Sequence, residues 1–476
     1  MRRITTLCAI GLAAIIGFSS CQPKEQKVYI ASLNDMHANI DNFPKLAFVV
    51  DSLRTLYPDM LLFAAGDNRS GNPINDRYSE PARPMVELMN KVGFNLSCFG
   101  NHEWDSGLDA LRNVMNIADF PYVCANVQFD DSLNIPVKPY TIIEYNGLKL
   151  AVIGGIQLGL NGLPDFHPDR GAGAHFRPIE EVLPDYLFLR DECDALFLLS
   201  HCGFEGDIDI AEQFPQLDAI FGGHTHTLVE DTKLFNNVMV TQAQSKVKYL
   251  TLSTFTFDKK GKMIAKESQV ISILNASGVN EEVKAMVDEF NNNDVFAQIM
   301  GNNEAAIEDC YECFGCLMCD ADKECTGAQL AFQNYGGVRY DTLSARPITL
   351  KDIFSLDPFD NELIIFMMTG QEIIDLLSVS FFTDHGPNYC SGCTYSYSVD
   401  EEGQMTDCKV VLEDGTPLDM NATYSVVMNS YMSSAFDFAH EDPGTSTFRT
   451  SNEALVSYLA NHQNINYANA SRVTEK

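Results

Sequence analysis

The sequence is poor in positive charge, with 32 lysine and arginine residues against 65 aspartate and glutamate residues and a formal net charge of -33. Because like charges repel, this imbalance argues against the phosphate backbone of a nucleic acid as a partner. It also requires that any anionic substrate be captured locally, by bound metal ions or by a few arginine side chains. Solubility alone accounts for most of the acidity.

The sequence also lacks a long hydrophobic run, which excludes a membrane-spanning helix after the N-terminus. Residues 7–18 are apolar and follow two arginines, but this stretch is too short to cross a bilayer. Small residues and then Cys21 come next, an order that resembles the lipobox of a bacterial lipoprotein. We therefore expect residues 1–21 to be a signal peptide, Cys21 to be lipidated in the cell envelope, and residues 22–27 to be a tether. A plain secretory signal is the alternative.

Tryptophan is almost absent, since Trp104 is the only one. It lies in residues 99–107, FGNHEWDSG, where Asn, His, Glu and Asp crowd between two glycines.

The sequence shows no internal repeat and no low-complexity tract. Its 476 residues are too many for one hydrophobic core, so we expect two domains of about 200 residues each.

Five apolar runs in the first half of the chain each end in polar residues of the kind that bind metals. These runs are residues 27–35, 59–67, 96–103, 194–203 and 217–226. Helical patterns over 43–57 and 81–93 lie between them, which indicates an α/β fold of buried strands alternating with helices. The carboxyl ends of such strands form the usual site of an open sheet, so we expect the five endings to converge on one edge.

The five endings supply a mixed set of carboxylate, amide and imidazole groups. The candidates are Asp35, His37, Asp67, Asn101, His102, Asp105, His201, His224 and His226. Such a set fits two divalent metal ions bridged by a carboxylate, and the imidazoles favour Zn²⁺, Mn²⁺ or Fe over Mg²⁺ or Ca²⁺. Two neighbouring ions can clamp phosphoryl oxygens and lower the pKa of a bound water. Metal ions would also solve the problem that the acidic chain poses for an anionic substrate.

The order of these motifs identifies a family resemblance. DMH, GD, GNHE, SH and GGHTH resemble the signature of the calcineurin-like metallophosphatases, and NHEWDSG resembles that of their 5'-nucleotidase branch. Four later segments resemble the C-terminal domain of 5'-nucleotidases: NYGGVR (334–339), LDPFDNEL (356–363), MTGQEIIDLL (368–377) and NSYMSSAFDF (429–438). The resemblance covers roughly residues 27–475.

The resemblance implies a fold and an activity. Residues 28–275 are expected to form a four-layer α/β/β/α metallophosphatase domain, and residues 301–476 an α+β substrate-binding domain. Residues 276–300 resemble the acidic, exposed linker helix about which the two domains of the family rotate. The expected activity is the release of phosphate from nucleoside 5'-monophosphates by a two-metal phosphoester hydrolase.

The resemblance also implies a role for each motif residue in the first domain. Asp35, His37 and His226 would hold one metal ion. Asn101, His201 and His224 would hold the second, and Asp67 would bridge the two. His102 and Asp105 would form a dyad beside the phosphate that stabilises the transition state or protonates the leaving oxygen. Glu103 has no role in the family pattern, and Trp104 is simplest to interpret as packing beneath the turn.

The second domain is expected to hold the nucleotide. The implied substrate residues are Asn334, Arg339, Phe359, Asn361, Tyr431 and Asp437. Arg339 would pair with a phosphate or carboxylate, for which a fixed fork of donors suits better than lysine. Phe359 and Tyr431 would sandwich the base, and Asn361 and Asp437 would contact the base edge and ribose. For any single aromatic residue, core packing is the alternative.

The substrate half departs from the family pattern in two places. Glu308 stands near the position where the family usually has another substrate-contacting arginine, and the sequence has no arginine between Arg190 and Arg339. SSAFDF also lacks the expected paired glycines. One cation fewer leaves other substrates open: the pyrophosphate of a nucleotide sugar or dinucleotide, or a 2',3'-cyclic phosphodiester. A more distant alternative is an inactive nucleotide-binding lipoprotein.

Fourteen cysteines are many for such a chain. Cys310, Cys313, Cys316 and Cys319 follow one another at a spacing of three, Cys325 comes next, and Cys390 and Cys393 form another CxxC pair. The first three resemble the start of an iron–sulfur run, but the fourth spacing is wrong and no proline follows. On a helix, four such residues would drift around the axis. Because export favours disulfides, we expect one or more of these, although the sequence does not give the pairing. Unpaired buried cysteines are the first alternative and a bound metal or cluster the second.

Overall fold

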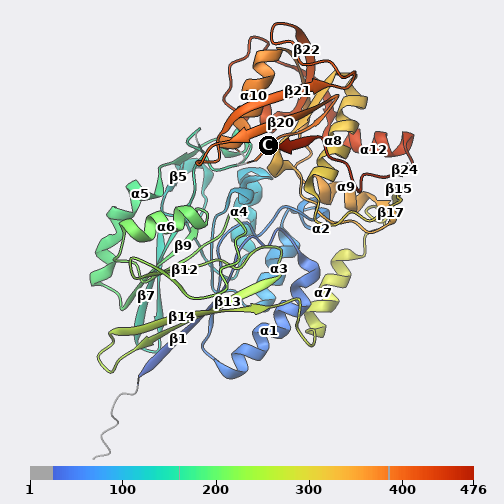
Figure 1. The fold of residues 1–476 in the computed structure, drawn as a ribbon. Helices are drawn as coiled ribbons and strands as arrows, with labels where there is room; N and C mark the ends of the chain where they lie inside the picture. Colours follow the sequence, from blue (N-terminus) through green and yellow to red (C-terminus); the bar gives the residue numbers. More distant parts are fainter. Residues whose placement is uncertain (1–24, 160, 384–385) are drawn as a thin grey trace, which may run out of the picture.

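The computed structural model describes residues 25–159, 161–383 and 386–476, which form two bodies (Figure 1). The predicted signal peptide and Cys21 lie outside the described residues. The lower body in Figure 1 contains the chain up to helix α7 (Glu281–Asn291), and the upper body contains the rest. Among the described helices, none has both the length and the apolar character needed to cross a membrane.

The first body contains two six-stranded sheets. One has the spatial order β14 (Met263–Ser272), β13 (Tyr249–Phe257), β1 (Gln26–Leu33), β2 (Leu61–Ala64), β3 (Leu96–Cys98) and β4 (Tyr122–Val123). The other has the order β11 (Lys233–Phe235), β12 (Val238–Thr241), β10 (Ala219–Phe221), β9 (Ala195–His201), β7 (Leu148–Ile156) and β6 (Tyr140–Tyr145). A small separate ribbon pairs β5 (Val127–Phe129) with β8 (Ala174–Phe176).

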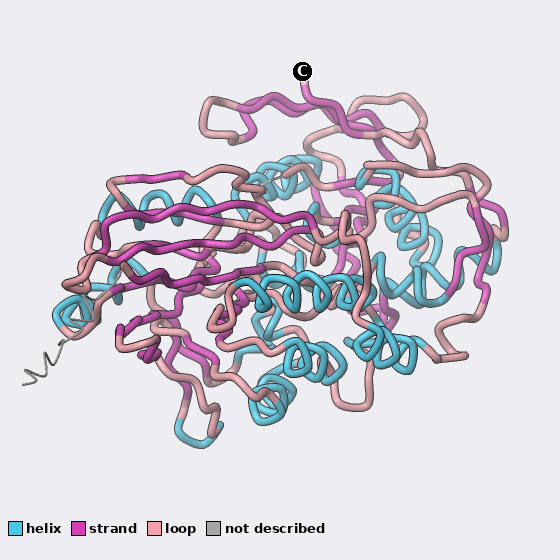
Figure 2. Tube along the Cα trace, turned by 90° about the horizontal axis from the view of Figure 1, so that it is seen from below, coloured by secondary structure: helices cyan, strands magenta, loops and turns pink. Residues whose placement is uncertain are grey.

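Helices cover the outer faces of both sheets, so the first body has four layers (Figure 2). They are α1 (Phe43–Leu56), α2 (Pro73–Asp76), α3 (Arg83–Val92), α4 (Gly107–Ile117), α5 (Ile179–Val182) and α6 (Phe204–Gln213). In β2, Phe63 joins the core between the two sheets, and its neighbour Leu62 joins the core beneath the helices. Because successive strand residues face opposite ways, a strand with both faces covered is apolar throughout. This explains the continuous apolar runs of the sequence.

The sequence pattern suggested that the five strand ends lie on a single sheet edge, but they do not. Strands β1, β2 and β3 run parallel in one sheet, whereas β9 and β10 run parallel in the other. The prediction was wrong because strand periodicity does not reveal which strands pair, and β1 also pairs with the distant β13. The ends of the two sheets face each other, and their loops meet between them.

The linker helix α7 belongs to the packing of the first body. Asn280 caps it by accepting a hydrogen bond from the backbone N–H of Val283 at 3.1 Å. Val283 and Val287 are buried in the core beneath α1 and α3. The predicted exposed helix therefore exposes its acidic face alone.

The second body is built on a five-stranded sheet with helices around it. Its order is β19 (Tyr389–Ser391), β16 (Leu330–Gln333), β22 (Thr423–Asn429), β18 (Glu362–Thr369) and β23 (Thr445–Thr450). Two three-stranded sheets accompany it: β17 (Arg346–Thr349), β15 (Ile299–Asn303) and β24 (Asn464–Ile465), and β21 (Met405–Leu412), β20 (Cys393–Val399) and β25 (Val473–Glu475). The helices are α8 (Tyr311–Thr326), α9 (Leu350–Leu356), α10 (Gly370–Thr383), α11 (Ser430–Ala435) and α12 (Ser451–Asn461). This is the expected α+β arrangement.

The cysteine-rich segment forms the start of α8. Cys310 and Cys313 are joined by a disulfide, so two of the four evenly spaced sulfur atoms are not available as thiolate ligands. Cys316 and Cys319 are buried free thiols, as are Cys390 and Cys393. The disulfide fixes the first turn of the helix.

Candidate metal centre and active site

The loops after β1, β2, β3, β9 and β10 bring the predicted metal ligands together. Three overlapping groups have ligand atoms within 4.8 Å of one another: Asp35, His37 and His226; His37, Asp67 and His102; and Asp35, Asp67 and His201. Asn101 and His224 adjoin them, with Asn101 Oδ1 at 3.1 Å from His224 Nδ1. All seven predicted ligands are thus brought to one place.

The two carboxylates each use one oxygen for the scaffold and turn the other toward histidines. Asp35 Oδ2 accepts hydrogen bonds from the backbone N–H of His224 at 2.9 Å and from Asn34 Nδ2 at 2.6 Å. Asp35 Oδ1 is buried without a hydrogen-bond partner and lies 3.3 Å from His226 Nε2.

Asp67 is placed between the two groups of histidines. Its Oδ1 accepts the backbone N–H of His102 at 2.9 Å. Its Oδ2 lies 3.2 Å from His201 Nε2 on one side and 3.9 Å from His37 Nε2 on the other. This is the position that a bridging carboxylate requires.

Backbone carbonyls fix the orientation of two imidazoles. His201 Nδ1 lies 2.7 Å from the carbonyl oxygen of Ala65, and His37 Nδ1 lies 3.1 Å from that of Ser70. Because a carbonyl only accepts, each Nδ1 carries a proton, and Nε2 is the nitrogen left for a metal ion. His201 Nε2 is buried without a hydrogen-bond partner, and His37 Nε2 lies 2.9 Å from His226 Nε2. These nitrogen atoms point at common positions that a cation would fill.

The residues present therefore fit divalent metal ions. Two ligand atoms that each lie about 2.1 Å from one ion are about 3 Å apart, which matches the separations among these carboxylate and imidazole atoms. The buried atoms without partners, Asp35 Oδ1 and His201 Nε2, are also the ones that face the histidine and carboxylate groups. Mixed nitrogen and oxygen donors suit Zn²⁺ or Mn²⁺.

The charges of the site support the same conclusion. Burial acts to raise the pKa of Asp67, but His201 and His102 outweigh it and hold the pKa well below its usual range. Burial acts to lower the pKa of His201, but Asp67 and Asp35 raise it to about 10. Burial also acts to raise the pKa of Asp35, but His226 and His201 outweigh it and lower that pKa. Both carboxylates are thus ionised away from water, where imidazolium groups or metal ions must balance their charge.

The ligand loops have an unusual backbone. Five of the seven ligands have positive φ angles: Asp35 (48°), His37 (46°), Asp67 (51°), His224 (82°) and His226 (54°). Left-handed residues other than glycine are uncommon, and they gather where the surrounding structure imposes a functional geometry. Gly100 permits a close approach of two loops, since a Cβ there would collide with Asp67 Oδ1.

The turn that follows β3 is the 3-10 helix η2 (Asn101–Trp104). His102 Nδ1 lies 2.9 Å from Asp105 Oδ2, and Ser70 Oγ donates to the same oxygen. His102 Nε2 faces Asp67 Oδ2 at 3.8 Å. Burial acts to lower the pKa of His102, but Asp67 and Asp105 raise it. The predicted dyad therefore has the required geometry, with one ring nitrogen anchored and the other toward the metal ligands.

Glu103 has a structural role that the sequence analysis missed. Its buried carboxylate accepts three backbone N–H groups: Gly100 at 2.6 Å, Asp67 at 2.9 Å and Asn68 at 2.8 Å. Burial and the charge of Asp67 raise its pKa to about 7. Glu103 ties the loop of the bridging carboxylate to the loop of the dyad. Its position inside a ligand-rich turn was the only sequence signal.

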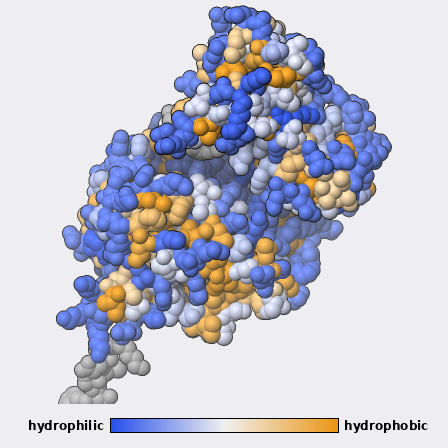
Figure 3. Space-filling view, in the orientation of Figure 1, coloured by the Kyte–Doolittle hydropathy of each residue, from blue (hydrophilic) through white to orange (hydrophobic). Residues whose placement is uncertain are grey.

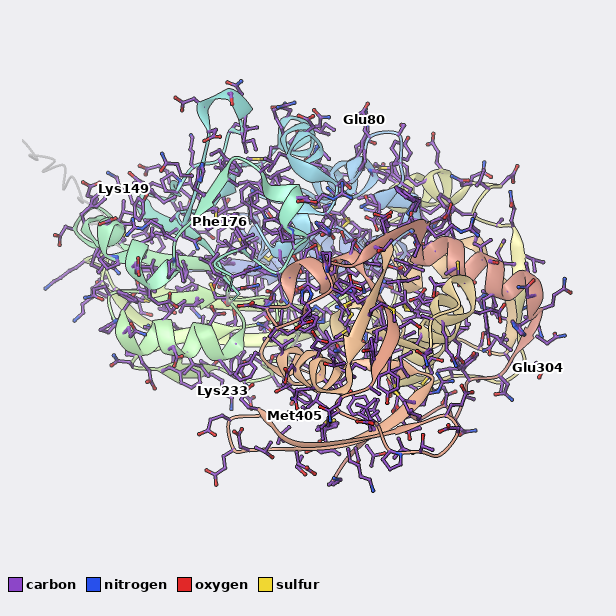
Figure 4. The ribbon with its side chains drawn as sticks, turned by 90° about the horizontal axis from the view of Figure 1, so that it is seen from above. Glu80, Lys149, Phe176, Lys233, Glu304 and Met405 are labelled. Atoms are coloured by element: carbon purple, nitrogen blue, oxygen red, sulfur yellow. A yellow bond between two sulfur atoms is a disulfide. The ribbon has the colours of Figure 1, made fainter. Side chains whose placement is uncertain are left out.

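Trp104 does more than fill space beneath the turn. Its fully buried ring stacks on Phe166, with centroids 5.1 Å apart, and on Phe129, with centroids 5.6 Å apart. Phe176, labelled in Figure 4, meets its edge at 5.2 Å. Trp104 thus anchors the segment after β7 to the metal-binding turn.

A cavity of about 710 Å³ lies where the two bodies meet, and the surface is hollowed there (Figure 3). The first body lines it with Asp67, Asn101, His102, Asp105, His224 and His226. The second body lines it with Asn334, Arg339, Phe359, Asn361 and Tyr431, so five of the six predicted substrate residues reach it. The sixth, Asp437, is exposed outside the lining, as is Glu308.

Two of the predicted substrate residues touch the metal half directly. Arg339 Nη2 lies 3.0 Å from His37 Nε2. The Phe359 ring stacks on His102 at 5.5 Å with an interplanar angle of 24°. The first body also contributes three arginines to the cavity, Arg69, Arg77 and Arg170, which the sequence analysis missed because no motif marks them.

Known proteins match the chain over both bodies. Residues 28–228 match the calcineurin-like phosphoesterase family model, and residues 295–439 match the model of the 5'-nucleotidase C-terminal domain. Protein UshA of Escherichia coli is 25% identical, over 91% of this chain and 90% of its own length. Endonuclease YhcR of Bacillus subtilis is also 25% identical, over 85% of this chain, which spans 37% of the length of that relative.

The solved structures agree on the fold. A 5'-nucleotidase precursor from Thermus thermophilus superposes with a TM-score of 0.84 at 21% identity, covering 94% of this chain and 99% of that one. The fold, the gathered metal ligands and the two matched domains lead to one classification. The chain belongs to the 5'-nucleotidase family of calcineurin-like metallophosphatases, a family of metal-dependent phosphoester hydrolases.

Proposed function

We propose that this protein is an exported two-metal phosphoester hydrolase that releases phosphate from nucleoside 5'-monophosphates. The observation that carries the proposal is the cavity, because it joins ionised metal-ligand side chains to the aromatic and arginine side chains expected for a nucleotide. A relative from Vibrio parahaemolyticus, 25% identical over 79% of each chain, is named 5'-nucleotidase.

The proposal assigns the metal ligands as follows. Asp35, His37 and His226 would hold one divalent ion, Asn101, His201 and His224 would hold the other, and Asp67 would be shared. Such ions, Zn²⁺ or Mn²⁺, would supply charge to the phosphoryl oxygens and activate water. The spacing of Asp67 Oδ2 between His201 and His37 supports the shared position.

The side chains of the protein then perform the remaining tasks. Asp105 anchors His102 through Nδ1, which leaves Nε2 to hold a proton for the leaving oxygen or to stabilise developing charge. Arg339 reaches the metal ligands and can pair with the reacting phosphate.

The proposed nucleotide grip comes from the second body, which lines the cavity together with the metal ligands. Phe359 and Tyr431 would hold the base between their rings, and Asn334, Asn361 and Asp437 would provide polar contacts. Asp437 lies outside the present lining, so its contact with the ribose or base would need a local shift of the chain after α11.

The proposal extends to location and boundaries. The chain would be anchored in a bacterial cell envelope by a lipid on Cys21, with membrane contact through that lipid alone. The catalytic domain would span residues 28–275, the linker 276–300, and the substrate domain 301–476. The last strand of the first body, β14, ends at Ser272, which supports the first limit, whereas β15 (Ile299–Asn303) crosses the second.

Cleavage of a nucleotide pyrophosphate or a 2',3'-cyclic phosphodiester is the second candidate. It is favoured by Arg170, an exposed arginine that the first body contributes to the cavity. An inactive nucleotide-binding lipoprotein is less well supported, because the full ligand set with its buried charges is retained.

Phosphate release tests the proposal directly. The protein Gln22–Lys476, stripped of metal and reloaded with Mn²⁺, would be assayed on AMP, UDP-glucose, NAD and a 2',3'-cyclic nucleotide, with a coupled phosphatase for the diesters. We expect AMP to react fastest and His102→Ala to lower the rate about 10²-fold or more. Turnover of a diester while AMP stays inert would instead establish the second candidate.

A further inference from the structure

Four arginines of the described chain line the cavity, and three of them are already engaged. Arg339 lies against His37 on the metal side. Arg77 pairs with Asp360 of the second body at 2.6 Å, and its guanidinium carbon lies 3.9 Å from the centre of the Phe354 ring.

Arg69 is engaged in a different way. Arg69 is only 3% exposed, Nη2 donates to Ser106 Oγ, and Nε and Nη1 are buried without a hydrogen-bond partner. A ligand in the cavity cannot reach these donors without rearrangement. Arg69 therefore supports the turn after the dyad and does not offer its fork to a substrate.

Arg170 differs from the other three. It is exposed in the short helix η4 (Pro168–Gly171), and among the described residues no carboxylate lies within ion-pair distance of its guanidinium. Its neighbour His167 also lines the cavity. Burial lowers the pKa of that imidazole, so the positive charge of this segment at neutral pH comes from Arg170. In a chain with a net charge of -33, an unpaired guanidinium at a cavity is unusual.

The segment that carries Arg170 is held firmly against the metal half. Asn101 Nδ2 donates to the carbonyl of Asp165 at 2.9 Å, and Gln157 Nε2 donates to its carboxylate at 2.7 Å. Phe166 stacks on Trp104 with an interplanar angle of 14°. Arg170 is therefore positioned relative to the metal ligands by the first body alone, whatever the second body does.

We propose that Arg170 is a substrate-binding residue that pairs with a second anionic group of the substrate, beyond the phosphate at the metal ligands. The substrate class is a nucleotide with two phosphate groups, and the inference rests on the proposed phosphoester hydrolysis. With ADP, water adds to the terminal phosphorus, the bond from that phosphorus to the bridging oxygen breaks, and AMP leaves with the proton. The first body thus supplies the cation that the sequence lacks near Glu308.

The test compares ADP with AMP in the Mn²⁺-loaded protein. Arg170→Gln should lower kcat/KM for ADP about 10-fold or more, mainly through KM, and change that for AMP less than about 2-fold. Arg170→Lys should restore part of the loss. Arg177→Gln is the matched control, since Arg177 is an exposed arginine near Glu181 that does not line the cavity. Equal losses on both nucleotides, or none on either, would overturn the proposal.

Calorimetric titration separates this inference from the proposed function. ADP and AMP would be titrated into metal-loaded protein in which His102→Ala slows turnover, with and without Arg170→Gln. If Arg170→Gln weakens the binding of ADP but not of AMP, the role of Arg170 is supported even if AMP proves not to be a substrate. Unchanged ADP affinity contradicts it even if AMP is hydrolysed.

Discussion

The two halves of the cavity are built differently. In the metal half, Asp35 and His201 are fully buried, and each has one side-chain atom fixed by the scaffold and another left facing the ligand group. In the substrate half, Phe359 and Tyr431 are only partly buried and come from loop and helix-start positions. The metal half is thus preorganised for chemistry, whereas the substrate half can adjust to its ligand.

Asp67→Asn should break the metal half most completely. The amide oxygen of Asn can still accept the His102 N–H. The uncharged amide nitrogen then stands between His201 and His37 in place of a carboxylate oxygen. We expect at most one tightly bound ion per chain and a loss of activity of about 10³-fold or more, measured by elemental analysis and phosphate release. Two retained ions with more than a tenth of the activity would contradict the bridging role.

Asp67 of the metal half is held ionised, whereas the pKa of Asp357 in the substrate half is raised, and a pH series tests this contrast. Burial raises its pKa to about 6, while its carboxylate oxygens accept from the N–H of Phe359 and from Ser451 Oγ. Because this pKa lies above the unfolded value of about 3.9, the protonated carboxyl makes its full contribution to the free energy of unfolding below about pH 4. This contribution is lost as the pH rises through 6. The loss should be about 3 kcal/mol.

Urea unfolding of wild type and Asp357→Asn between pH 4 and 8 measures this contribution. Asn keeps the acceptor for Phe359 without ionising, so the stability difference between the two proteins should change with pH in that window. A difference that stays constant across the window would show that Asp357 does not titrate as described.

Glu103→Gln should weaken the metal half without removing a ligand. The amide nitrogen cannot accept, so at least one buried N–H among Gly100, Asp67 and Asn68 loses its partner. Supporting residues of this kind typically change metal affinity or activity about 10–100-fold. Excess Mn²⁺ should restore part of the activity, and a loss that no metal concentration relieves would contradict a positioning role.

Phe359→Ala should act chiefly on substrate binding, with a smaller effect through the loss of its stacking on His102. Loss of one base-stacking ring typically costs about 1–3 kcal/mol, so KM for AMP should rise about 10-fold with little change in kcat. Metal content should stay at the wild-type level. Tyr335→Ala is a suitable control, because this 42%-exposed ring lines the same cavity without a predicted base contact. Equal effects of the two variants would remove the special role of Phe359.

The features of the metal half were unequally predictable from sequence. Asp35, Asp67 and His226 were readable because aspartate and histidine tolerate the left-handed backbone at ligand turns and directly follow apolar strands. The two-sheet arrangement was not readable from periodicity, because β1 pairs with a strand more than 200 residues later. Arg170 and Glu103 were missed because their positions depend on tertiary contacts, which no local sequence pattern predicts.

The burial of Trp104 has a practical consequence. Because Trp104 is the only tryptophan in the sequence, tryptophan fluorescence reports on one position. The indole contacts the ring of Phe166 and is next in sequence to Glu103, which ties the two ligand loops together. Emission from a fully buried indole lies toward the blue and shifts to the red when water reaches it. Loosening of the metal-binding turn can therefore be followed optically in the unlabelled protein, while rearrangements confined to the second body leave the signal unchanged.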